Sequence, residues 1–484
     1  GEVIRLSVAL RDARWPVTID PLVYLEDQRL GPVSLGVGDL VGADRFGNSA
    51  AISGDIAIVG APWDGVDGNI NQGSAYVFVR SAGDWILEKK IVASDGAPYN
   101  YFGASVALSG ETAVVGAPVD DVASSTDNGW AYVFIRDGGA WSQQQRLAAS
   151  DGVGDDRFGA SVALDTDTAV VGAPFADAAY VFARTAGSWT EQQKLTHGCS
   201  GGDFGRSVAL SAATAVIGSP LCDVNHGTFT NFDEGAAFVF VRGAGTWSYE
   251  KTLLASDGFL NDQFGTSVAL SGDVTLVGSP LGNVGGVGID HGAAYVFART
   301  WTVQLWAQEQ KLVADDAAGN DRFGYSVALV GDTALVGSPL ADVGGASDAG
   351  SAYVFLRGAP WSQARKLVAR DGAASDLFGV SVALSSTATL VGARGADGVG
   401  PSGVIDEGAA YFGRLVSTDA SGGSICAEAS DCTSGFCVDG VCCDAACGGS
   451  DATDCQACSV AAGAVTDGVC VVVSTGTPCS DGDA

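Results

Sequence analysis

Short apolar runs separated by polar turns occupy most of the chain. One representative stretch contains four such runs, Ser105–Leu108, Ala113–Gly116, Trp130–Phe134 and Trp141–Leu147, with a tight polar turn at Ser109–Thr112. Runs of this length, bounded by Gly, Pro and Asp, are typical of strands, because those residues form turns and end strands. The stretch therefore predicts four short antiparallel strands.

The same four-run pattern recurs along the chain at intervals of about 55 residues. Each copy begins with Phe-Gly, at Phe46, Phe102, Phe158, Phe204, Phe264, Phe323 and Phe378. Six copies then contain Gly-Ala-Pro or Gly-Ser-Pro, whereas the seventh reads Gly392-Ala393-Arg394. Four antiparallel strands in a repeat of this length indicate a propeller blade rather than a solenoid coil. The sequence thus predicts an all-β, seven-bladed β-propeller of four-stranded blades.

The last repeat lacks a fourth strand after Ala410–Phe412, and a matching segment lies at Tyr24–Leu30. We expect this N-terminal strand to complete the seventh blade and close the ring. The predicted organisation is a remnant of an upstream segment at 1–23, the propeller at 24–416, a linker at 417–424 and a cysteine-rich disulfide module at 425–484. Because the chain contains no methionine, we expect residue 1 not to be a translation start.

These Phe-Gly and Gly-Ala-Pro repeats resemble the FG-GAP repeats of integrin α-subunit propellers and of bacterial secreted proteins. In that family, calcium is held in the turn between the first two strands of a blade. Here those turns are short, as at Ser109–Thr112 and Ser271–Val274, and only Asp165-Thr166-Asp167 retains part of the pattern. The resemblance therefore predicts the fold, and we do not transfer the family's calcium sites to this chain.

Charge and cysteine content narrow the class of protein. A net charge of −31 excludes ordinary nucleic-acid binding, since a polyanion repels phosphates. The sequence has no apolar run long enough to span a membrane, so we expect no direct membrane insertion. Ten of the 12 cysteines lie between Cys426 and Cys479, which indicates disulfides and a secreted or cell-surface location. Zinc is the alternative, supported by Cys455-x-x-Cys458 and the adjacent Cys442 and Cys443.

Aspartates gather in two kinds of loop that share one face of the ring. We call the loop before the first strand of a blade the leading loop, and the loop between its second and third strands the middle loop. Their aspartates predict an acidic rim, on which calcium is a candidate ligand. The candidate calcium ligands are Asp64, Asp67, Asn69, Asn71, Asp120, Asp121 and Asp127. The alternative is that these residues simply form turns.

Loop differences between repeats suggest a ligand site. Cys199 lies in a leading loop and Cys222 in the middle loop of the same repeat, so we predict a disulfide between them. The middle loop of the third repeat is almost absent, which predicts a notch beside the third blade. Asp177, His226 and Phe229 are the candidate ligand-binding residues there.

The repetition also argues against catalysis. A serine in a Gly-x-Ser motif, such as Ser105 or Ser267, stands in every repeat, and a residue needed seven times is structural rather than a nucleophile. We therefore expect a non-enzymatic extracellular module that binds a protein or glycan through its acidic loop face. An extracellular hydrolase or lyase that uses rim carboxylates, and a structural spacer in a larger envelope protein, remain the alternatives.

Overall fold

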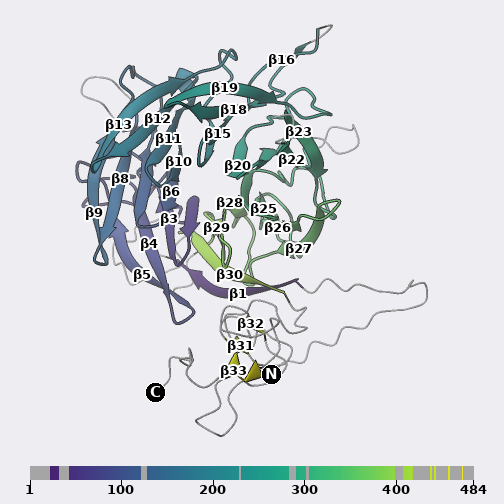
Figure 1. Ribbon diagram of the computed structural model, residues 1–484. Coiled ribbons are helices and arrows are strands. Elements are labelled where there is room, and N and C mark those ends of the chain that lie inside the picture. Colours follow the sequence, from purple (N-terminus) through teal and green to yellow (C-terminus); the bar gives the residue numbers. More distant parts are fainter. Residues whose placement is uncertain are drawn as a thin grey trace. The chain divides into compact units, whose positions relative to one another are not determined.

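The computed structural model of the chain describes residues 22–31, 43–120, 128–227, 230–282, 290–300, 305–397 and 407–417, and four two-residue strands nearer the C-terminus (Figure 1). The chain divides into two units, of which Leu25–Arg414 is the larger. The other unit contains two short strand pairs, β31 (Cys437–Val438) with β32 (Val441–Cys442) and β33 (Gln456–Ala457) with β34 (Val471–Val472). The remainder of the cysteine module lies outside the described residues.

The larger unit is a ring of seven four-stranded antiparallel sheets, which confirms the predicted propeller (Figure 1). Blade 1 comprises β2 (Ser49–Ser53), β3 (Ile56–Ala61), β4 (Ser74–Ser81) and β5 (Asp84–Ile91); blade 2 comprises β6 (Ser105–Ser109), β7 (Thr112–Ala117), β8 (Trp130–Asp137) and β9 (Ala140–Leu147); blade 3 comprises β10 (Ser161–Asp165), β11 (Thr168–Ala173), β12 (Ala178–Thr185) and β13 (Ser188–Leu195); blade 4 comprises β14 (Ser207–Ser211), β15 (Thr214–Ser219), β18 (Ala236–Gly243) and β19 (Thr246–Leu253); blade 5 comprises β20 (Ser267–Ser271), β21 (Val274–Ser279), β22 (Ala293–Thr300) and β23 (Leu305–Leu312); blade 6 comprises β24 (Ser326–Val330), β25 (Thr333–Ser338), β26 (Ser351–Leu356) and β27 (Ser362–Leu367); blade 7 comprises β28 (Phe378–Leu384), β29 (Thr389–Ala393), β30 (Ala409–Ser417) and β1 (Leu22–Leu30).

Two small elements interrupt the middle loops. A pair of two-residue strands, β16 (Val224–Asn225) and β17 (Thr230–Asn231), forms in the middle loop of blade 4. A single 3-10 turn, η2 (Pro174–Ala176), replaces that loop in blade 3. Among the described residues no helix is long and apolar enough to cross a membrane.

The N-terminal strand closes the ring, as predicted from its resemblance to the missing fourth strand. β1 pairs with β30 at the outer edge of blade 7. From β1, the Gln28 side-chain amide donates to the carbonyl oxygen of Trp85 in blade 1 and accepts from the Trp85 backbone N–H, at 3.0 and 2.8 Å. The first and last segments of the propeller are therefore tied both within a blade and across to the next one.

The recurrent serine ties each blade to its neighbour. Ser105 Oγ, at the start of β6, donates to the carbonyl oxygen of Gly159 in the next blade at 2.8 Å. The equivalent bond occurs at all seven blade junctions, and Ser381 closes the circle by donating to Gly47. The remaining donors are Ser49, Ser161, Ser207, Ser267 and Ser326. This confirms the structural reading of the repeated Gly-x-Ser motif.

The repeated glycines permit the same close approach between blades. A Cβ on Gly116, from the Gly-Ala-Pro motif, would lie 2.0 Å from the carbonyl oxygen of Gly159. The preceding Phe158 is buried edge-on against Tyr180 and Phe182, at ring-centroid distances of 5.5 and 5.9 Å. The Phe-Gly dipeptide thus fills the gap between blades with its ring and allows backbone contact through its glycine.

Candidate functional site

Leading and middle loops share one face of the ring, which we call the loop face, and the two-residue turns lie on the opposite turn face. Parallel bridges connect the end of a middle loop to the next leading loop, as between Gly73 and Phe102 and between Gly235 and Phe264. The two loop types from adjacent blades therefore form continuous patches, and the shared face expected from the strand order is present.

Many rim aspartates are engaged within the protein. In blade 5, Asp257 accepts a hydrogen bond from the Tyr295 hydroxyl at 2.9 Å and pairs with Lys311 at 2.7 Å. Burial opposes ionisation of Asp257, but the bonds from Lys311 and Tyr295 outweigh it and lower the pKa of that carboxyl. Burial also raises the pKa of Tyr295, which stays protonated as the donor. Equivalent tyrosine–aspartate–cation clusters are Tyr180 with Asp151 and Lys194, Tyr353 with Asp316 and Lys366, and Tyr411 with Asp371 and Arg29.

Two candidate calcium ligands likewise accept a hydrogen bond from a buried tyrosine of a third strand. Asp64 is fully buried, accepts hydrogen bonds from the hydroxyls of Ser74 and Tyr76, and pairs with Lys90 at 2.9 Å. Asp120 accepts from the Tyr132 hydroxyl at 2.5 Å. The sequence shows that these aspartates lie in loops, but not that their side chains turn inward to meet a tyrosine.

The other described candidate calcium ligands, Asp67, Asn69 and Asn71, lie in a turn of the blade 1 middle loop. Val66 and Asn69 exchange backbone hydrogen bonds in a tight turn, and the Asn69 side chain donates to Gln72. Asp67 and Asn71 both adopt left-handed backbone conformations, as turn residues do. Asp121 and Asp127 lie outside the described residues. Within the described part of the chain, no group of three or more His, Cys, Asp or Glu is placed to hold a metal ion. Calcium binding therefore stays a prediction from the sequence.

The predicted notch residues have internal partners. Asp177 follows η2 and accepts hydrogen bonds from the backbone N–H groups of Gly201 and Phe204 in the next leading loop. His226 Nε2 lies 2.7 Å from a carboxylate oxygen of the fully buried Glu234. Phe229 lies outside the described residues. Their role in ligand binding stays a prediction.

The structure joins Cys199 to Cys222 by a disulfide, the pairing that the sequence predicts. The bond links the leading loop of blade 4 to its middle loop, where Cys222 is buried.

A second set of aspartates shapes the leading loops. In the motif Asp-x-Phe-Gly, the aspartate accepts from a backbone N–H three residues earlier, as Asp262 does from Phe259 at 2.9 Å. Asp156, Asp321 and Asp376 repeat this bond. Burial raises the pKa of Asp262 to about 6. The recurrence of Asp two residues before Phe-Gly was a signal for this role that the sequence analysis did not use.

Exposed apolar side chains are a further feature of the loop face. Seven of the large hydrophobic residues exposed on the described surface lie in leading or middle loops: Ile70, Tyr99, Val153, Phe175, Phe232, Phe259 and Leu260. Phe232 and the Phe259–Leu260 pair are neighbours, because the Asn261 N–H donates to the Phe232 carbonyl oxygen at 2.9 Å. We call Phe232, Phe259 and Leu260 the apolar patch. The sequence did not predict it, because aspartates are the most conspicuous residues of these loops.

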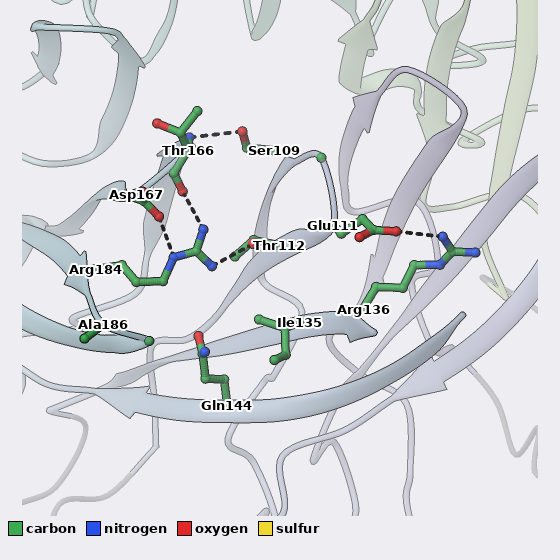
Figure 2. Close-up of a pocket in the computed structure, with 12 residues that line it drawn as sticks. Ser109, Glu111, Thr112, Ile135, Arg136, Gln144, Thr166, Asp167, Arg184 and Ala186 are labelled. Carbon is green, nitrogen blue, oxygen red and sulfur yellow. Dashed lines mark hydrogen bonds and ion pairs between the residues drawn. The ribbon is translucent and has the colours of Figure 1, made fainter. Parts of the chain in front are cut away.

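The turn face contains a wide cavity of about 770 Å³ between blades 2 and 3 (Figure 2). Its arginines are already paired: Arg184 contacts Asp167 at 2.6 Å and Arg136 contacts Glu111 at 3.1 Å, as Figure 2 shows. The acidic residues of the short turns therefore neutralise arginines of the third strands. A ligand in this cavity would have to displace those pairs.

Comparison with known proteins agrees with the fold. A search of proteins with curated descriptions finds no significant match. The profile of the FG-GAP repeat matches seven consecutive segments, at residues 35–78, 85–134, 141–182, 189–240, 247–297, 306–355 and 361–421. Propellers built from such repeats are commonly binding modules and generally non-catalytic. Because these segments cover more than half of the sequence, the chain belongs to the FG-GAP repeat family.

Proposed function

We propose that this chain is an extracellular binding module that recognises a partner protein through its loop face. The observation that supports this proposal is the apolar patch: Phe232 and Phe259 are 60% and 61% exposed although they are large aromatic residues. Exposed, clustered aromatics on a rigid scaffold are typical of the centres of protein interfaces. The propeller supplies that rigidity, since each blade is bonded to its neighbours.

The surroundings of the patch fit a polar interface rim. Asp233 follows Phe232 directly in the sequence and lies on the same face. Its charge favours encounter with a basic partner, while the desolvated aromatics supply most of the affinity. The acidic loop face remains the proposed binding surface, but the aromatic rings rather than the carboxylates are expected to supply most of the binding free energy.

Cysteine usage supports an extracellular location. The disulfide between Cys199 and Cys222 and the ten cysteines in residues 426–479 suit an oxidising compartment. FG-GAP repeats are also typically extracellular.

The test compares two double variants with the wild-type chain in capture of surface and secreted proteins from the organism that makes it. Phe232→Ser with Phe259→Ser removes the apolar patch. The matched control, Ile86→Ser with Leu305→Ser, removes side chains that are 55% and 53% exposed on the outer strands β5 and β23. We expect a specific partner to be lost by the first variant and retained by the control.

Equal capture by both double variants would overturn the proposal. The same three proteins applied to a glycan array test the other ligand class that the sequence left open. Binding to a glycan that depends on Phe232 and Phe259, with no protein captured, would replace the protein partner with a glycan.

A further inference from the structure

A cavity of about 290 Å³, which we call the axial cavity, lies on the loop face where the central axis of the ring reaches the surface. Its position follows from the repeat. The residue directly after Phe-Gly comes immediately before the innermost strand in blades 1 to 6 and lies within that strand in blade 7. The innermost strands β2, β6, β10, β14, β20, β24 and β28 contact one another in turn around the axis of the ring (Figure 1). Five residues in that position line the cavity: Asn48, Ala160, Arg206, Tyr325 and Val380. The cavity is therefore built by several blades together.

Three arginines line this cavity, and its described lining contains no acidic residue. Arg206 follows the fourth Phe-Gly, and Arg157 precedes the third. Arg394 stands where the other six repeats have proline, so the departure from Gly-Ala-Pro in the seventh repeat places a guanidinium at the axis. In a chain of net charge −31, three arginines at one small cavity are a local reversal of charge.

Within the described part of the chain, these three arginines form no ion pair. Most lysines and arginines of the propeller pair with a carboxylate within 4.0 Å, as Arg136, Arg184 and Lys311 do. Arg157, Arg206 and Arg394 form no ion pair with any described residue. Arg394 instead donates to the Asn48 side-chain oxygen at 3.1 Å, and Arg157 lies over the Phe175 ring at 4.5 Å.

Those two contacts orient the guanidinium groups and leave their charge unneutralised. Asp203, which lies beside the cavity but does not line it, interacts electrostatically with both Arg206 and Arg157. Asp203 also interacts with Asp177 and Asp233, which do not line the cavity. The described lining itself therefore carries three guanidinium groups and no carboxylate.

We propose that the axial cavity is a binding site for a compact oxyanion group, a carboxylate, sulfate or phosphate carried by a small ligand. Guanidinium groups bind such oxyanions through paired N–H donors. The cavity volume suits a ligand about the size of one sugar or organic acid. The negative charge of the rest of the chain disfavours a polyanion, which would have to lie across the acidic loops. The site is separate from the apolar patch and does not depend on the proposed function.

Isothermal titration calorimetry with the full chain tests the proposal. The probes are inorganic phosphate, sodium sulfate and sodium glucuronate, with glucose as the uncharged counterpart of glucuronate. We expect one binding event per chain for at least one oxyanion and none for glucose. Binding of glucuronate alone would indicate a sugar acid, and binding of phosphate or sulfate alone a tetrahedral anion. No heat from any of the three up to millimolar concentration would overturn the proposal.

Variants locate the site. Arg206→Gln and Arg394→Gln should each weaken binding by about tenfold or more. Ala160→Phe, which fills the cavity and keeps its charge, should also abolish binding. Arg370→Gln is the control, because Arg370 is exposed in the leading loop of blade 7 and does not line the cavity. Circular dichroism identifies any variant that fails to fold. If Arg206→Gln fails to fold, Arg206→Lys, which lacks the paired N–H donors, replaces that variant. Oxyanion binding unchanged in both Arg206→Gln and Ala160→Phe would also overturn the proposal.

Discussion

Replacing Asp262 by asparagine should stabilise the propeller at neutral pH. The Asp262 side chain is 2% exposed, and its second oxygen, Oδ1, has no hydrogen-bond partner among the described residues. Burial raises the pKa of Asp262 to about 6, although the Phe259 N–H and Lys311 favour the charged form. The negative charges of Asp257 and of the buried Glu234 nearby oppose ionisation further. Asparagine keeps a carbonyl oxygen for the Phe259 N–H and removes the buried charge.

The size of the effect follows from the two pKa values. Below the ordinary pKa of 3.8, the carboxyl is protonated in the folded and unfolded chain alike and adds nothing. As pH rises toward 6, only the unfolded carboxyl ionises, so the folded state loses stability. Each pH unit between the two values costs about 1.4 kcal/mol, which gives about 3 kcal/mol above pH 7 and about half of that at pH 5.

Urea unfolding followed by tryptophan fluorescence at pH 5.0 and 7.5 measures this gain, and both values lie above the sequence pI of 4.1. The control is Asp316→Asn, because hydrogen bonds from Lys366 and Tyr353 outweigh burial and lower the pKa of Asp316. Loss of the Asp316 carboxylate in this control variant should lower the stability of the chain at both pH values. A gain from Asp262→Asn that is absent, or that is the same at pH 5.0 and 7.5, would refute the argument.

Two further predictions concern the loop disulfide of blade 4 and a hydrogen bond between blades 4 and 5. Cys199→Ser should lower the free energy of unfolding by about 3 kcal/mol, since it opens a loop with a sequence separation of 23; unfolding of the oxidised and reduced wild-type chain provides the comparison, and equal stability of the two would contradict it. Ser207→Ala should cost about 1 kcal/mol, because it leaves the Gly265 carbonyl oxygen at the start of blade 5 without its donor from blade 4. Ser248→Ala, on the exposed strand β19, should change the unfolding midpoint little, and an equal loss in the two serine variants would argue against an inter-blade role.

The sequence predicts the ring well because the ring depends on residues that recur. Phe158, Gly159 and Ser161 have counterparts in every repeat, and each makes the contact that the repetition implies. The closing strand is also visible in the sequence, since β1 carries the same pattern as β13. Its start differs from the expected one by two residues, at Leu22 rather than Tyr24.

The loop face is predicted less well because its chemistry depends on side-chain direction. Asp64 and Asp67 look equivalent in the sequence, yet Asp64 turns inward to Tyr76 and Lys90 whereas Asp67 is exposed. The difference arises because a buried tyrosine hydroxyl from the third strand needs an acceptor, and the loop supplies the nearest carboxylate. A count of loop aspartates cannot separate the two, and so it overstates the free negative charge of the rim.

In a repeat protein, the residues that differ between repeats are the ones that can select a ligand, and the axial cavity is lined by such residues. Positions that recur seven times are explained by contacts between blades, so they leave no preference for one ligand. The position after Phe-Gly does not recur: it holds arginine, tyrosine, asparagine, threonine, valine and alanine around one axis. Contacts between blades involve one of these residues, since Asn48 donates to the Ala104 carbonyl oxygen and accepts from Arg394, which replaces a proline that six repeats retain. Positions that are structurally equivalent but chemically different are therefore where selection for a ligand would act. One of them, Arg206, lines the axial cavity together with Arg157 and Arg394, and none of these arginines forms an ion pair with a described residue.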